Sequence, residues 1–150
     1  MDIRDLITKQ LITLRLLSRE KKAIIEELST LLMENGYLTD LETFVQDVLK
    51  REELGTTGIG FGVAIPHAKS AAVKRSALAF ARPVCGVEWD SLDGRPVHLV
   101  FLIAVPAESA GNEHLKILSA LSRKLIHEDF RRVLQEAKDE SDVLAALTGI

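Results

Sequence analysis

The chain has 150 residues, 47% of them apolar and 27% charged, which suffices for one domain, 1–150, with a buried core. Its formal net charge of −3 argues against nucleic acid or an anionic membrane as the main partner. The longest apolar run, 99–105, is far shorter than the roughly 20 residues that a membrane-spanning helix needs. The N-terminus lacks a signal-peptide pattern, and the single cysteine excludes an internal disulfide, so we expect a soluble cytoplasmic protein without direct membrane insertion.

The first third of the chain predicts a short apolar segment followed by two helices. Residues 11–17 fit either an edge strand or the start of a helix. From Ser18 onward apolar residues recur at helical spacing, and Asn35-Gly36 supplies a left-handed stop. A second helix is predicted to begin at the capping box Thr39-Asp40-Leu41-Glu42 and to end before Gly55.

The most informative stretch is the glycine-rich segment 58–68, in which His67 follows a short apolar run. Pro66 disfavours a helical conformation at Ile65, so we expect an extended chain to lead into His67. Alternating glycines let backbone N–H groups approach a ligand closely. His67 is therefore a candidate phosphoryl acceptor or metal ligand, although the local pattern taken alone favours an ordinary loop histidine.

The second half of the chain predicts strands covered by helices. Residues 76–84 and 97–105 are strand candidates, with a turn at Asp93-Gly94 between them. The second strand shows no polar alternation, which is typical of a strand buried on both faces of a sheet. The predicted helices begin at Asn112 or cover 129–137 and 141–147. We therefore predict a single α/β domain, with a mixed β-sheet of about five strands flanked by helices on both faces.

Two further side chains are candidates for the same chemistry. His114 lies in the first turn of the helix that begins at Asn112, where the helix dipole favours a neutral imidazole. A half-buried histidine bonded to a backbone carbonyl fits equally well. Arg51 is expected in the last turn of its helix, where a cation complements the dipole without any further role. The predicted inner face of the helix carrying His114 comprises Leu115, Leu118, Leu121, Leu125 and Ile126.

Two stretches of the chain together match a known pattern. The first runs from Leu49 through Gly58-Ile59-Gly60 to Ala64-Ile65-Pro66-His67, and the second includes Leu92-Asp93-Gly94 and Gly111-Asn112-Glu113-His114. This combination resembles the fructose/mannitol-type enzyme IIA domain (EIIA type 2) of the bacterial phosphoenolpyruvate-dependent sugar phosphotransferase system. The resemblance covers about 11–147 and is closer to the fructose branch than to the mannitol branch.

The resemblance implies that His67 accepts a phosphoryl group from the histidine-containing phosphocarrier protein and passes it to a cysteine of a IIB domain. It places the family's second histidine at His114 and its arginine at Arg51, and it matches Thr57 to a phosphate-binding hydroxyl position in the loop. No metal or other cofactor is required, because donor and acceptor are both phosphoproteins. The chain departs from the commoner loop pattern at Phe61, where many members have a polar residue, and this bears on the local partner surface.

The chemistry suits these residues independently of the family. Neutral imidazole is a nucleophile that forms a labile P–N bond, and an arginine fork can bind the equatorial oxygens of the transferred group. Backbone N–H groups at 68–71 would add an anion site if they opened a short helix. We also expect an apolar rim around the site, because donor and acceptor must dock there in turn.

Two other functions remain open at this point. Stand-alone members of the family also act as phosphorylation-state sensors, of the nitrogen-regulatory type, that bind target proteins. A metal-dependent hydrolase using His67 and His114 would need a third ligand, and no His-Glu-x-x-His spacing stands near either residue.

Overall fold

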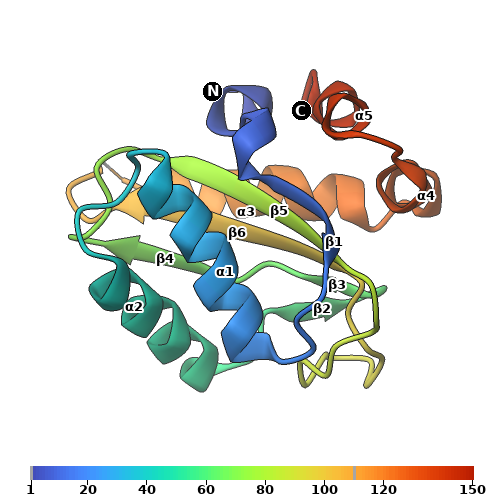
Figure 1. The fold of residues 1–150 in the computed structure, drawn as a ribbon, viewed down its shortest axis with the longest axis horizontal. Helices are drawn as coiled ribbons and strands as arrows, with labels where there is room; N and C mark the ends of the chain where they lie inside the picture. The colour runs from blue at the N-terminus through green and yellow to red at the C-terminus, as the bar shows by residue number, and fades with distance from the viewer. Residues whose placement is uncertain (1, 110) are drawn as a thin grey trace.

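The computed structural model describes residues 2–109 and 111–150. These residues form one mixed sheet with helices on both of its faces, α1 and α2 on one side and α3 on the other (Figure 1). The strands are β1 (Ile12–Leu16), β2 (Gly58–Gly60), β3 (Val63–Ala64), β4 (His67–Ser70), β5 (Ala77–Pro83) and β6 (Leu99–Pro106). The helices are α1 (Lys21–Glu34), α2 (Leu41–Leu54), α3 (Glu113–Leu125), α4 (Glu128–Glu136) and α5 (Glu140–Leu147), preceded by 3₁₀ turns at Ile3–Leu6 and Lys9–Leu11.

The sheet has the order β1-β5-β6-β3-β2, with β4 also paired to β6. The edge strand β1 is parallel to β5, β5 is antiparallel to β6, and β3 and β4 both run parallel to β6. The predicted α/β class is therefore confirmed, with six strands in place of about five. The glycine-rich segment around His67 contributes three of the six strands, because it is divided into β2, β3 and β4.

That division follows from two local breaks in the chain. Phe61 and Gly62 have φ values of 62° and 76°, so they turn the chain between β2 and β3. Val63 pairs with Leu99 and His67 pairs with Ile103, so β3 and β4 lie one after the other along β6. Pro66, which has no N–H to donate, separates them. The uninterrupted strand β6 thus fixes the position of His67.

The core is built around β6, as its unbroken apolar sequence predicts. Every residue from Leu99 to Val105 is buried, and helices α1 and α3 contact this strand from the two faces of the sheet. Asn35 and Gly36, which has a φ of 83°, end α1 where the sequence predicts.

Two expectations about the helices are wrong in detail. The N-cap of α2 is Asp40, whose carboxylate accepts the N–H of Thr43, whereas the hydroxyl of Thr39 donates to the Ala72 carbonyl. In α3 the buried stripe is Ile117, Leu121 and Leu125. Leu115 and Ile126, expected on the inner face, are 50% and 53% exposed. The helix carries two apolar stripes, and only one of them faces the sheet.

Across the described ranges, every helix is too short or too polar to cross a membrane.

Candidate active site

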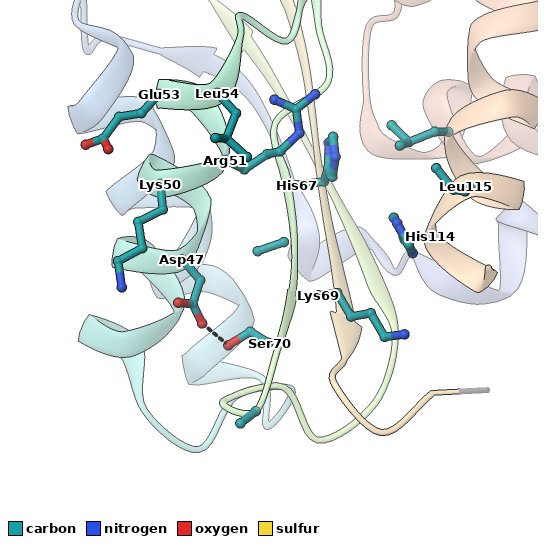
Figure 2. Close-up of a pocket in the computed structure, with 13 residues that line it drawn as sticks. Asp47, Lys50, Arg51, Glu53, Leu54, His67, Lys69, Ser70, His114 and Leu115 are labelled. Atoms are coloured by element: carbon teal, nitrogen blue, oxygen red, sulfur yellow. Dashed lines mark hydrogen bonds between the residues drawn. The ribbon is translucent and has the colours of Figure 1, made fainter. Parts of the chain in front are cut away.

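His67 lines a pocket between α2, β4 and α3 (Figure 2). Its residue exposure is 8%, and its backbone is fixed by pairing with β6. The pocket has a volume of about 850 Å³. It is lined by Asp47, Lys50, Arg51, Glu53 and Leu54 from α2, by residues 67–71, and by His114, Leu115 and Leu118 from α3. The structure therefore brings three of the predicted site residues, His67, His114 and Arg51, to one place.

The hydrogen bonding of His67 defines which ring nitrogen is free to react. Nδ1 lies 3.0 Å from the carbonyl oxygen of Ile65. A carbonyl only accepts hydrogen bonds, so Nδ1 carries the proton and Nε2 keeps its lone pair. Pro66 between these two residues holds the short loop that makes this bond.

The surroundings of His67 favour the neutral imidazole. Burial lowers the pKa of His67 most strongly, and the positive charge of Arg51 and the neighbouring His114 lower it further. The hydrogen bond to Ile65 and the charge of Glu52 act in the opposite direction, without reversing the shift. A neutral ring with a free Nε2 is the form that can attack phosphorus.

Arg51 caps the C-terminal end of its helix and also faces the site. Its Nη1 donates to the carbonyl of Gly55 at 2.8 Å, which is the helix-capping contact that its position in the last turn predicts. The guanidinium lies beside the His67 ring in Figure 2. The remaining N–H groups of this planar fork suit the oxygens of a phosphoryl group on Nε2.

His114 faces His67 from the other side of the pocket. The two rings are stacked, with centroids 6.5 Å apart and planes inclined by 30°. Nδ1 of His114 is buried and has no hydrogen-bond partner among residues 2–109 and 111–150. The carbonyl partner that an ordinary structural histidine would have is thus missing at this atom.

Thr57 lies outside this pocket. It is 4% exposed, and its hydroxyl donates to the carboxylate of Glu52 and accepts the indole N–H of Trp89 at 3.2 Å. Sequence reasoning missed Glu52 and Trp89, which are 9% and 1% exposed. A signal for Glu52 was present, because it follows Val45 and Val48 at helical spacing on the buried face of α2.

The short helix suggested at 68–71 is absent, because this segment continues as strand β4 along β6. Ser70 ends the strand, where its hydroxyl donates to Asp47 at 2.6 Å and accepts the N–H of Ala72 at 3.1 Å. The backbone anion site predicted here is therefore not formed. The positive charges at the pocket come from the side chains of Lys50, Arg51 and Lys69 instead. Of these, Lys50 points away from His67 (Figure 2).

Two exposed leucines flank the opening of the pocket. Leu54 at the end of α2 is 85% exposed and Leu115 in the first turn of α3 is 50% exposed. They supply exposed apolar surface beside His67, as we expect for the rim of this site.

Within the residues that the structure describes, no three His, Cys, Asp or Glu side chains converge in a way that would hold a metal ion.

Comparison with known proteins gives the chain its relatives. It is 46% identical over 144 residues to the fructose-specific EIIABC component of Bacillus subtilis, covering 96% of this chain and 22% of that protein. It is 44% identical to the fructose-specific EIIA component of Haloferax volcanii, covering 97% of each chain. The chain therefore spans about a fifth of the first relative and almost all of the second.

Solved structures show the same fold. The nitrogen regulatory protein IIA-Ntr of Neisseria meningitidis superposes with a TM-score of 0.90 at 37% identity, covering 97% of this chain and 99% of that one. The complex of enzyme IIAMTL with phosphorylated enzyme IIBMTL from Escherichia coli matches with a TM-score of 0.81 at 25% identity, covering 96% of this chain and 98% of that one. A family model described as "Phosphoenolpyruvate-dependent sugar phosphotransferase system, EIIA 2" matches residues 5–149. The chain belongs to this EIIA family of the sugar phosphotransferase system.

Proposed function

We propose that this protein is a phosphoryl carrier that receives phosphate on Nε2 of His67 and passes it on. The observation that carries this proposal is the 3.0 Å bond from Nδ1 of His67 to Ile65, which leaves Nε2 as the nucleophile. Arg51 and His114 lie on either side of the ring in the same pocket. The donor is the histidine-containing phosphocarrier protein, and the acceptor is a cysteine of a IIB domain.

The transfer needs no cofactor. In the first step the lone pair on Nε2 attacks phosphorus, and the P–N bond of the donor breaks with its electron pair returning to the donor imidazole. In the second step the IIB thiolate attacks the same phosphorus, an S–P bond forms, and the electron pair of the breaking P–N bond returns to Nε2. Nδ1 keeps its proton and its bond to Ile65 throughout. Arg51 stabilises the charge on the equatorial oxygens, and His114 donates one ring N–H to one of them.

The fructose-specific relatives at 44% and 46% identity favour a role in the uptake of a fructose-like sugar. The complex of IIAMTL with phosphorylated IIBMTL supports a IIB domain as the acceptor. Phosphoenolpyruvate supplies such a relay inside the cell, so the proposed role places the protein in the cytoplasm.

A regulatory role is the second candidate. The likeness to IIA-Ntr, with a TM-score of 0.90, favours a phosphorylation-state sensor that binds target proteins through the surface around His67. In that case phosphate would be accepted on His67 but would pass poorly to any sugar-specific IIB domain.

A reconstituted relay tests both candidates. The protein is mixed with phosphoenolpyruvate, Enzyme I and the phosphocarrier protein, and intact mass and acid lability are measured for wild type and His67→Ala. One acid-labile phosphate on wild type alone supports the carrier role. Adding fructose-type IIB then separates uptake from regulation, because only an uptake component loses its phosphate rapidly. A folded wild type without phosphate would contradict the proposal.

A further inference from the structure

A buried carboxylate lies next to Arg51 in the chain, and the proposed transfer does not use it. The side chain of Glu52 is 4% exposed and is not part of the pocket wall. Its oxygens accept from four donors: Lys21 Nζ at 2.7 Å, Trp89 Nε1 at 3.2 Å, the Thr57 N–H at 3.3 Å and the Thr57 hydroxyl. Three of these donors converge on Oε1 and the Thr57 hydroxyl binds Oε2, so both oxygens of this carboxylate are bonded within the fold.

A contribution to stability does not by itself explain why a buried, charged side chain such as Glu52 stands here. Removing a carboxylate and an ammonium from water is costly, and well-packed apolar residues often stabilise a core equally well. The partners of Glu52 come from separate parts of the chain, with Lys21 at the start of α1 and Trp89 in the connection between β5 and β6. The carboxylate thus joins three segments at one point and fixes their relative positions.

A series of hydrogen bonds leads from this point to the reactive histidine. Glu52 holds the N–H and hydroxyl of Thr57, and the carbonyl of Thr57 accepts the N–H of Ile65 at 3.0 Å. The carbonyl of Ile65 in turn accepts Nδ1–H of His67 at 3.0 Å. The orientation of the Ile65 carbonyl, which selects the tautomer of His67, therefore depends on where Glu52 holds Thr57.

The same segment also holds Arg51. Its Nη1 donates to the carbonyl of Gly55, two residues before Thr57. The Trp89 connection is packed closely against this segment, since a Cβ on Gly58 would lie 2.6 Å from Oγ of Ser91. Movement of the segment 55–58 would therefore displace both Arg51 and the partner of His67.

We propose that Glu52 is a positioning residue for phosphoryl transfer, which acts through Thr57 and Ile65 to hold His67 as an Nε2 nucleophile beside Arg51. This inference rests on the proposed function of His67. It also gives the Thr57 hydroxyl a role that differs from the phosphate contact implied by the family resemblance, because that hydroxyl is occupied by Glu52.

The test is Glu52→Gln, which keeps the shape of the side chain but removes its charge and replaces one acceptor by an NH₂ group. We expect phosphate acceptance from the phosphocarrier protein to slow roughly 10- to 100-fold in kcat, the factor that one hydrogen bond to a charged group provides. KM for the donor should change little, because Leu54 and Leu115 at the pocket rim are unaltered. In the unphosphorylated protein, ¹⁵N chemical shifts of the His67 ring should show a loss of the Nδ1–H tautomer.

Val143→Ala in α5 is the matched control for stability, because Val143 is buried and lies outside the network. A merely structural Glu52 would behave like this control, with a lower melting temperature and an unchanged kcat and unchanged His67 ring shifts. That result would overturn the inference while leaving the proposed function intact.

Thr57→Val provides a second route if Glu52→Gln does not fold. It removes the hydroxyl that donates to Glu52 and accepts from Trp89, and we expect a smaller decrease in kcat with the same change in the ring shifts. Unchanged ring shifts and kcat in folded Thr57→Val would overturn the inference. If wild type accepts no phosphate, the proposed function fails, and the ring shifts still report whether Glu52 sets the tautomer.

Discussion

Two arginines donate to carbonyls at the C-terminal ends of two helices, and their surroundings differ in an instructive way. Arg82 in β5 donates to four carbonyls, those of Leu14, Leu134, Gln135 and Ala137, and joins the end of α4 to the sheet. Arg51 at the end of α2 has one such bond, to Gly55 at 2.8 Å. The first guanidinium is committed to the fold, whereas the second keeps donors directed to a pocket that contains two histidines.

The difference extends to the two regions around these arginines. At the junction of α4 and the sheet, the structure satisfies the polar groups internally, which is the usual condition of buried backbone. In the pocket of His67, a ring nitrogen of His114 is buried without a described partner, and two leucines are exposed at the rim. What distinguishes the site from the scaffold is the combination of an unpartnered histidine nitrogen and a guanidinium with free donors around one buried histidine.

The largest effect is expected from removing the nucleophile. His67→Ala should abolish phosphorylation. Among the described side chains of the pocket, only His67 has its Nδ1 bonded to the Ile65 carbonyl, which leaves Nε2 as the nucleophile. His127→Ala is the control, since His127 is exposed at the start of α4 and makes no capping bond. Intact mass after incubation with the phosphorylated carrier protein measures both variants. A stoichiometric acid-labile phosphate on His67→Ala would refute the assignment.

Matched substitutions at the two arginines test the comparison directly. Arg51→Ala should slow phosphoryl transfer about 100- to 1,000-fold, as expected for loss of one donor to a transition-state anion. Arg82→Ala should leave the transfer rate of the folded protein unchanged and lower the free energy of unfolding by about 3 kcal/mol, because several carbonyls lose a charged donor.

Single-turnover transfer rates and urea denaturation separate these two outcomes. If Arg51→Ala lowered stability but transferred phosphate at the wild-type rate, its helix-capping contact would be its whole role. If Arg82→Ala slowed transfer in the folded state, the division between scaffold and site would be wrong.

Much of the scaffold could be predicted because a few strong local signals dominate it. The unbroken apolar run of β6 indicates a strand buried on both faces, and Asn35-Gly36 marks the end of α1. The meeting of His67, His114 and Arg51 in one pocket was also expected, although that expectation came from the family resemblance and not from periodicity. Their roles in transfer remain predictions.

The remaining features depend on contacts between distant segments. Helix α3 has two apolar stripes, and only packing decides that Ile117 faces the sheet while Leu115 faces the pocket rim. Residues 68–70 pair with β6 instead of opening a helix, because β6 offers a free edge there. The position of Glu52 needs Lys21 and Trp89, which lie 31 and 37 residues away in the chain. A local pattern contains none of this information.

A smaller effect is expected at His114. His114→Ala should still accept phosphate, because Nε2 of His67 and Arg51 are unchanged. Onward transfer to IIB should slow roughly 10- to 100-fold, the factor that corresponds to one hydrogen bond to a charged group. Rapid-quench measurement of each half-reaction distinguishes acceptance from donation. Equal rates for His114→Ala and wild type in both half-reactions would make His114 a packing residue of α3.

The smallest effect concerns pH, and it follows from the burial of His67. Its pKa lies below the ordinary value of 6.5, so the folded state binds a proton less readily than the unfolded state. The stability that His67 contributes is therefore fully present above about pH 6.5 and is lost as pH falls from there through the folded pKa. Phosphate acceptance should fall only below that lowered pKa, because protonation removes the lone pair of Nε2.

Urea denaturation between pH 8 and pH 5 should show this loss of stability in wild type and a smaller loss in His67→Gln. Parallel pH profiles for the two proteins would mean that burial in the pocket does not control the charge of His67, and the contrast between site and scaffold would then lie in Arg51 and His114 alone.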